Sequence, residues 1–176
     1  MQLDHLRLLF DYNSWANRYL LDVAEQVTPE QLYAPDNSSF GGLYETLLHT
    51  MDTEWSWLNV VLLGDARGID WDALDIDPTD VPDVATLRTR WAEVDAALQA
   101  FVGDLEAEGD KSPDRVVMWL GDNDALRRRP VWQILLHVFN HGTQHRSEIA
   151  AILTRAGHSP GEMDLTRYLN IRDGIE

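Results

Sequence analysis

The sequence predicts an all-α protein, a four-helix bundle that forms a single domain over residues 1–176. Four segments, each of roughly 24 residues, repeat apolar side chains at the spacing of one helical face. A long crossover between the second and third segments is compatible with a bundle. Of the 176 residues, 44% are hydrophobic and 25% are charged, which is typical of a folded domain with one core.

The first expected helix spans residues 3–27, where Asn13 is the polar exception on an apolar face. The next four residues, Thr28-Pro29-Glu30-Gln31, are typical of a capping box, with Thr28 as the N-cap and Gln31 reaching back to it. This signal predicts a short connecting turn of helix.

The second expected helix spans residues 40–63, with Ser38 or Ser39 as its N-cap. Residues 64–83 then form an acidic connection that contains two prolines. The third expected helix spans residues 84–108, between a capping aspartate and a terminating glycine.

Residues 114–129 have a different pattern. The β-rich run 115–120, the turn residues 121–124 and the run 125–128 favour a small β-hairpin before the last long helix. Pro130 is expected to open that fourth helix, which spans residues 130–155. The tail is expected to fold back on the bundle through a short apolar set.

Charge and composition exclude several functions. A net charge of −16 disfavours nucleic acid as a partner, and the one basic run, Arg127-Arg128-Arg129, suits a solvated strand edge better than a phosphate site. No apolar run approaches the ~20 residues needed to span a bilayer, so no membrane association is expected. The chain has no cysteine, which excludes thiolate ligands and suits a cytoplasmic protein.

Histidines provide the strongest chemical signal. His137, His141 and His145 are spaced four apart, so neighbouring members lie about one turn apart on one helix. His137 and His145 are about 12 Å apart along the axis, too far to share one metal ion easily. His141 with His145, and His137 with His141, are therefore competing ligand pairs, and His49 is the best candidate for a third ligand.

Two acids lie within one turn of these histidines. Asp52 is three residues after His49, and Glu148 is three residues after His145. We take Asp52 and Glu148 as candidate catalytic acids or bases. Each could instead orient a histidine N–H.

Four motifs together resemble the DinB family over nearly the full length. They are Tyr12-Asn13-Ser14-Trp15-Ala16-Asn17, Leu48-His49 followed by Glu54-Trp55-Ser56-Trp57, His137-Val138-Phe139-Asn140-His141-Gly142-Thr143-Gln144-His145-Arg146, and Asp164-Leu165-Thr166-Arg167-Tyr168-Leu169. Where the family often has Arg-Gly-Gln after its last ligand, this chain has Arg146-Ser147-Glu148.

The resemblance implies an up-down-down-up four-helix bundle, often dimeric, with a divalent metal on three histidines. Mapped onto this chain, the ligands are His49, His141 and His145, which leaves His137 to pack or to orient them. Zn or Ni is the foremost expectation, and Fe, Mn and Cu are also compatible with imidazole ligands. Three neutral ligands would leave positions open for water or substrate.

Relatives with assigned activities use a low-molecular-weight thiol, as mycothiol-dependent maleylpyruvate isomerases and bacillithiol S-transferases do. We therefore expect a thiol-dependent S-transferase or isomerase that acts on a small electrophile. A metal-dependent hydrolase and a non-catalytic, stress-related, metal-binding dimer are the alternatives. The expected partners are a small-molecule substrate and a second copy of the chain.

Overall fold

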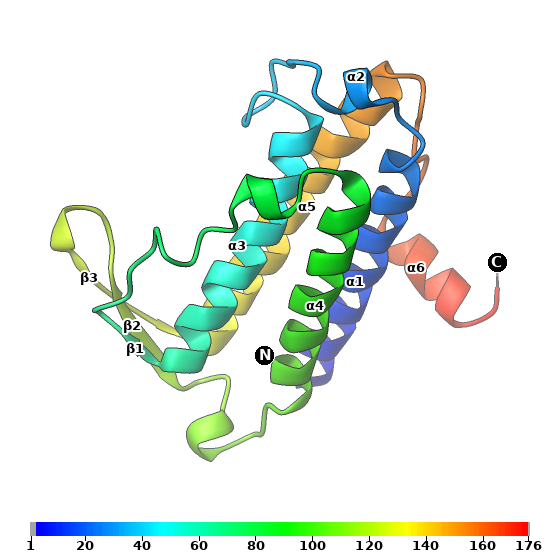
Figure 1. Cartoon of the computed structure of the whole chain (residues 1–176). Helices are drawn as coiled ribbons and strands as arrows, with labels where there is room; N and C mark the ends of the chain where they lie inside the picture. Colours follow the sequence, from blue (N-terminus) through cyan, green and yellow to red (C-terminus); the bar gives the residue numbers. More distant parts are fainter. Residues whose placement is uncertain (1–2, 176) are drawn as a thin grey trace.

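The computed structural model describes residues 3–175 (Figure 1), which are mostly helical with one small sheet. The long helices are α1 (Leu3–Ala24), α3 (Leu43–Leu63), α4 (Val84–Gly103) and α5 (Val131–Arg155). In Figure 1, α1 and α5 ascend while α3 and α4 descend. Both α1 and α3 contact α4 and α5, so every long helix has neighbours on two sides. None of the described helices combines the length and apolar content needed to cross a membrane.

Shorter helical segments lie between and after the long helices. The expected capping box is present at α2 (Pro29–Leu32), where Thr28 accepts from the Gln31 backbone N–H and the Gln31 side chain accepts from the Thr28 N–H. The C-terminal helix α6 (Leu165–Arg172) lies beside α1. The other described helical segments are the 3₁₀ turns Pro78–Asp80, Gly109–Lys111 and Asp122–Asp124.

Two expected helix ends are wrong because apolar side chains outside the helices are also buried. The first helix stops at Ala24 rather than residue 27, yet Val27 still packs against the core from the following turn. Helix α4 stops at Gly103 rather than residue 108, and Leu105 is buried after the helix has ended. Apolar spacing in a sequence reflects which residues are buried. Where the turn after a helix is also buried, the apolar pattern continues past the end of the helix.

The start of α3 also differs from the expectation. Gly41 has a φ of 88°, and Gly42 is the N-cap without any side-chain cap. A left-handed residue cannot lie inside an α-helix, so α3 begins at Leu43 and not at residue 40. Ser39 was an expected cap, but its hydroxyl instead donates to the Glu148 carboxylate.

The expected antiparallel pair is present before α5, and a third strand joins it. Strands β2 (Val116–Leu120) and β3 (Leu126–Pro130) pair antiparallel, with Val117 opposite Arg129 and Trp119 opposite Arg127. Strand β1 (Asp65–Ala66) pairs parallel with β2. This strand lies within the acidic connection that follows α3, where no strand was predicted.

A polar layer separates two apolar clusters in the interior. One cluster lies around Leu47 and Leu153, and the other around Leu58 and Leu135. Between them, Glu54 of α3 is 1% exposed and its carboxylate accepts three hydrogen bonds. The donors are Asn13 Nδ2 at 2.7 Å, Asn17 Nδ2 at 3.0 Å and Trp91 Nε1 at 2.7 Å.

Arg146 of α5 carries the opposite charge in this layer and is 1% exposed. Its guanidinium donates to the side-chain oxygens of Asn13 and Asn17, at 2.5 and 3.0 Å. The two asparagine amides therefore bridge the buried cation to the buried Glu54 anion. A Cβ at Gly142 would lie 2.8 Å from Arg146 Nη1 and 3.2 Å from Asn13 Oδ1, so the absence of a side chain there leaves room for the network.

We expect Glu54→Leu to lower the free energy of unfolding by about 3–5 kcal/mol, because the Arg146 cation would stay buried without its counter-charge. Adding Arg146→Met should restore part of the loss, and chemical denaturation measures both. The control is Glu93→Leu, which removes a 2.8 Å ion pair at a 63% exposed side chain and should cost less than about 1 kcal/mol. An equal loss in the two single variants would contradict the network's role.

Candidate metal centre

Three histidine rings converge between α3 and α5. His49 lies in α3, and His141 and His145 lie one turn apart on the neighbouring α5. The Nε2 atom of His141 is 3.1 Å from that of His49 and 3.1 Å from that of His145. One ligating atom from each residue lies within 4.8 Å of the other two.

These separations fit a shared metal ion. Two nitrogens bonded to one ion at about 2.1 Å, with an angle between octahedral and tetrahedral, are about 3.0–3.4 Å apart. Hydrogen bonds between the rings do not satisfy the whole set, because His141 Nε2 can donate at most one proton to its two neighbours. At least one lone pair is left facing the cluster, which suits a cation.

Glu148 determines which nitrogen of His145 is free. His145 Nδ1 lies 2.8 Å from Glu148 Oε2, and a carboxylate there holds the ring proton on Nδ1. The Nε2 lone pair of His145 is then available toward His141. Burial opposes ionisation of Glu148, but hydrogen bonds from Ser39 and His145 outweigh it and lower the pKa of Glu148.

Burial keeps the other two imidazoles neutral. It lowers the pKa of His49 to about 4, with the nearby His145 adding to the effect. Burial likewise lowers the pKa of His141 to about 4, with contributions from His145, His49 and His137. Neutral imidazole is the form that binds metal, so His49 and His141 need no deprotonation at neutral pH.

Phe40 belongs to the site although the sequence analysis placed it in a helix. Its ring stacks on His49 with centroids 3.6 Å apart and meets the His145 ring edge-on at 5.2 Å. The left-handed Gly41 ends the segment and turns Phe40 back over the histidines. The Phe40-Gly41-Gly42 run was the available signal, since such glycines permit a sharp reversal. Phe40 thus covers part of the histidine cluster.

Asp52 contacts the long connection that follows α3. Its carboxylate accepts the Ile76 backbone N–H at 2.9 Å, and burial raises the pKa of the group. This contact ties residues 64–83 to α3. A catalytic role for Asp52 therefore stays a prediction, as it does for Glu148.

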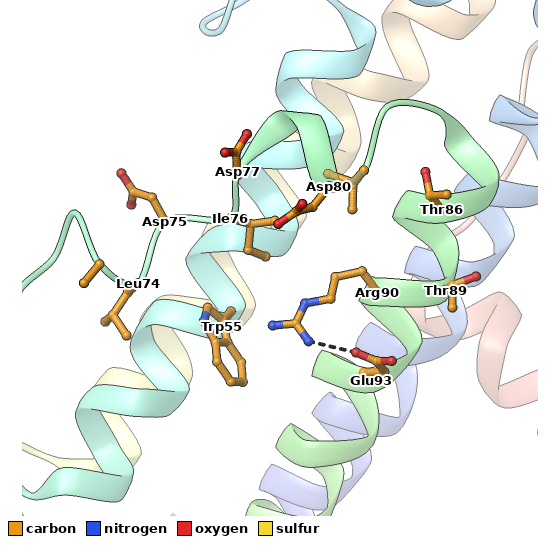
Figure 2. A pocket seen from close by; sticks show the side chains of 12 residues that line it. Trp55, Leu74, Asp75, Ile76, Asp77, Asp80, Thr86, Thr89, Arg90 and Glu93 are labelled. Atoms are coloured by element: carbon orange, nitrogen blue, oxygen red, sulfur yellow. Dashed lines mark hydrogen bonds and ion pairs between the residues drawn. The ribbon is translucent and has the colours of Figure 1, made fainter.

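A separate cavity lies away from the three histidines (Figure 2). It measures about 650 Å³ and lies between α3, α4 and the connection. The Arg90 guanidinium lies 4.9 Å from the centre of the Trp55 ring and forms an ion pair with Glu93. None of the three clustered histidines lines this cavity, so its size does not make it the metal centre.

Comparison with known proteins agrees with this arrangement. The profile of the DinB family matches residues 1–174. The chain belongs to the DinB family. It is similar to Protein DinB of Bacillus subtilis (strain 168), with 23% identity over 164 residues that cover 92% of this chain and 91% of the relative.

Membership of the DinB family confirms the resemblance drawn from the four motifs. The structure brings together His49, His141 and His145 as a group that could hold a metal ion. Within the described part of the chain, His137 lies outside that group, with its ring 5.7 Å from that of His141 and 5.3 Å from that of Trp57.

We expect Glu148→Ala to weaken Zn²⁺ binding about 10- to 100-fold, because His145 would lose the partner that orients its ring. Competition with a chromogenic chelator measures the affinity. Ser147→Ala is the matched control, since this neighbouring hydroxyl donates only to the Thr143 carbonyl of its own helix. Equal affinity in both variants would show that Glu148 does not support the site.

Proposed function

We propose that this protein is a divalent-metal-dependent enzyme, a thiol-dependent S-transferase or isomerase that acts on a small electrophile. The observation that carries the proposal is the convergence of His49, His141 and His145, with Nε2 atoms 3.1 Å apart in two of the three pairs. Zn or Ni is the proposed metal. Family membership also supports a homodimeric four-helix bundle as the active form.

The three histidines would hold the ion from two helices, and when bound it would act as a Lewis acid that lowers the pKa of a coordinated water or thiol. The chain's own groups prepare this site. Glu148 holds the proton on His145 Nδ1, and Phe40 shields the His49 ring from solvent. Thr53 Oγ1 is 3.4 Å from His49 Nε2 and offers a polar group beside the cluster.

Metal binding is the first test. The untagged protein should bind one equivalent of Zn²⁺ or Ni²⁺ per chain, measured by mass spectrometry after gel filtration. His49→Ala and His141→Ala should each remove most of this binding, because two imidazoles hold an ion far less tightly than three. His137→Ala is the control and should keep it. Less than about a tenth of an equivalent in the parent protein would refute a metal centre.

Thiol dependence then separates the possible reactions. The metal-loaded protein should consume a small thiol together with an activated aryl halide, and His141→Ala should abolish the protein-dependent rate. Hydrolysis of an activated ester without any thiol would instead favour a metal-dependent hydrolase. Metal binding with neither activity would favour the non-catalytic, stress-related alternative.

A further inference from the structure

A line of aromatic rings leads from the histidine cluster to the sheet. Because α3 and α5 run in opposite directions, residues after His49 lie beside residues before His141. The His137 ring is 5.7 Å from the His141 ring and 5.3 Å from the Trp57 ring. The Trp57 ring in turn meets Trp119 of β2 edge-on at 5.2 Å. The rings therefore make continuous contact over about two helical turns, or roughly 12 Å.

A cavity of about 420 Å³ lies along this line, against the rings of His137, Trp57 and Trp119. The rings of Trp57, Trp119 and His137 form flat walls of the cavity. The guanidinium of Arg129 and the amide of Gln133 provide hydrogen-bond donors. Small-molecule sites usually have mostly apolar walls with a few polar groups placed among them. The lining residues are Trp57, Trp119, Arg129, Gln133, Ile134 and His137.

The strand register directs Arg129 to this cavity. Cross-strand partners share a face of the sheet, so Arg129 lies on the face of its partner Val117, which is fully buried against the helices. Arg127 shares that face opposite Trp119, and it lines a second cavity to which Trp57 and Trp119 also contribute. Arg128 pairs with Met118 and lies on the opposite face.

The charge of Arg129 has no counter-ion among the described residues. The chain has 30 acidic and 14 basic residues, and ion pairs engage several of its arginines, including Arg18, Arg88 and Arg155. Among the side chains that the structure describes, no acidic group forms an ion pair with Arg129, whose guanidinium donates to the backbone carbonyl of Arg128 at 2.8 Å. In so acidic a protein, an unpaired guanidinium beside an aromatic cavity points to an anionic ligand.

We propose that this cavity is a substrate subsite for aryl carboxylates. The aromatic body would lie against Trp57, Trp119 and His137, and the carboxylate would accept hydrogen bonds from Arg129. The opposite end of the molecule would extend past His137 toward His141. The inference rests on the proposed function, because it assigns the substrate class of that same metal site.

Isothermal titration of the full-length protein with 2-naphthoate tests the subsite. Arg129→Met should weaken binding at least tenfold, whereas Arg128→Met should change it less than twofold. The two variants lose the same charge from adjacent residues of one strand, so they differ mainly in the face that loses it. Equal effects would overturn the proposal. So would the absence of binding by the parent protein up to about 5 mM.

Two further arms separate the carboxylate site from other sources of affinity. Neutral 2-naphthalenemethanol should bind at least tenfold more weakly than 2-naphthoate to the parent protein, and similar affinities would overturn the role of the anion. Each titration is repeated after metal removal with EDTA. Binding that survives EDTA and depends on Arg129 supports the subsite even if the protein proves to lack activity. Binding that vanishes with EDTA and ignores Arg129→Met places the carboxylate on the metal and overturns the subsite.

Discussion

The buried bridge between Glu54 and Arg146 is the constraint on which the rest of the structure depends. Asn13 and Asn17 each donate to the carboxylate and accept from the guanidinium, so α1 links α3 to α5 through paired amides. Each of these groups is costly to bury without its partners. The network therefore restricts how the helices can rotate or slide. Because Arg146 directly follows His145 on α5, the same restriction determines where His145 points.

Local patterns in the sequence account for much of this architecture. Helical spacing predicted the four long segments, and the Thr28 capping box predicted α2, because both signals arise within a few residues of the chain. The four-residue spacing of His141 and His145 likewise predicted adjacent rings. His49 was already the best candidate for the third ligand, but choosing the His141–His145 pair over the His137–His141 pair needed the family resemblance, since both pairs have the same four-residue spacing.

Features that depend on distant contacts were missed for physical reasons. Asn13 was visible as a polar exception, but its partner Glu54 is 41 residues away, and no periodicity connects them. The two-residue strand β1 exists only because β2 lies alongside it. Phe40 has the apolar character of a helix residue, and only the reversal at Gly41 brings its ring onto His49. Ser39 is a residue type that caps helices, but its hydroxyl donates to the Glu148 carboxylate instead.

The absence of a side chain at Gly142 limits which substitutions this helix can accept. The neighbouring His141 faces the cluster, and a Cβ added at Gly142 would lie only 2.8 Å from a nitrogen of the Arg146 guanidinium. The buried network and the candidate metal site thus share one helical turn, where a methyl group at Gly142 would press on the network directly beside His141. Substitutions are easier to accommodate in the β2–β3 hairpin. Its arginines and Trp119 lie outside the helical turn that holds Gly142 and His141.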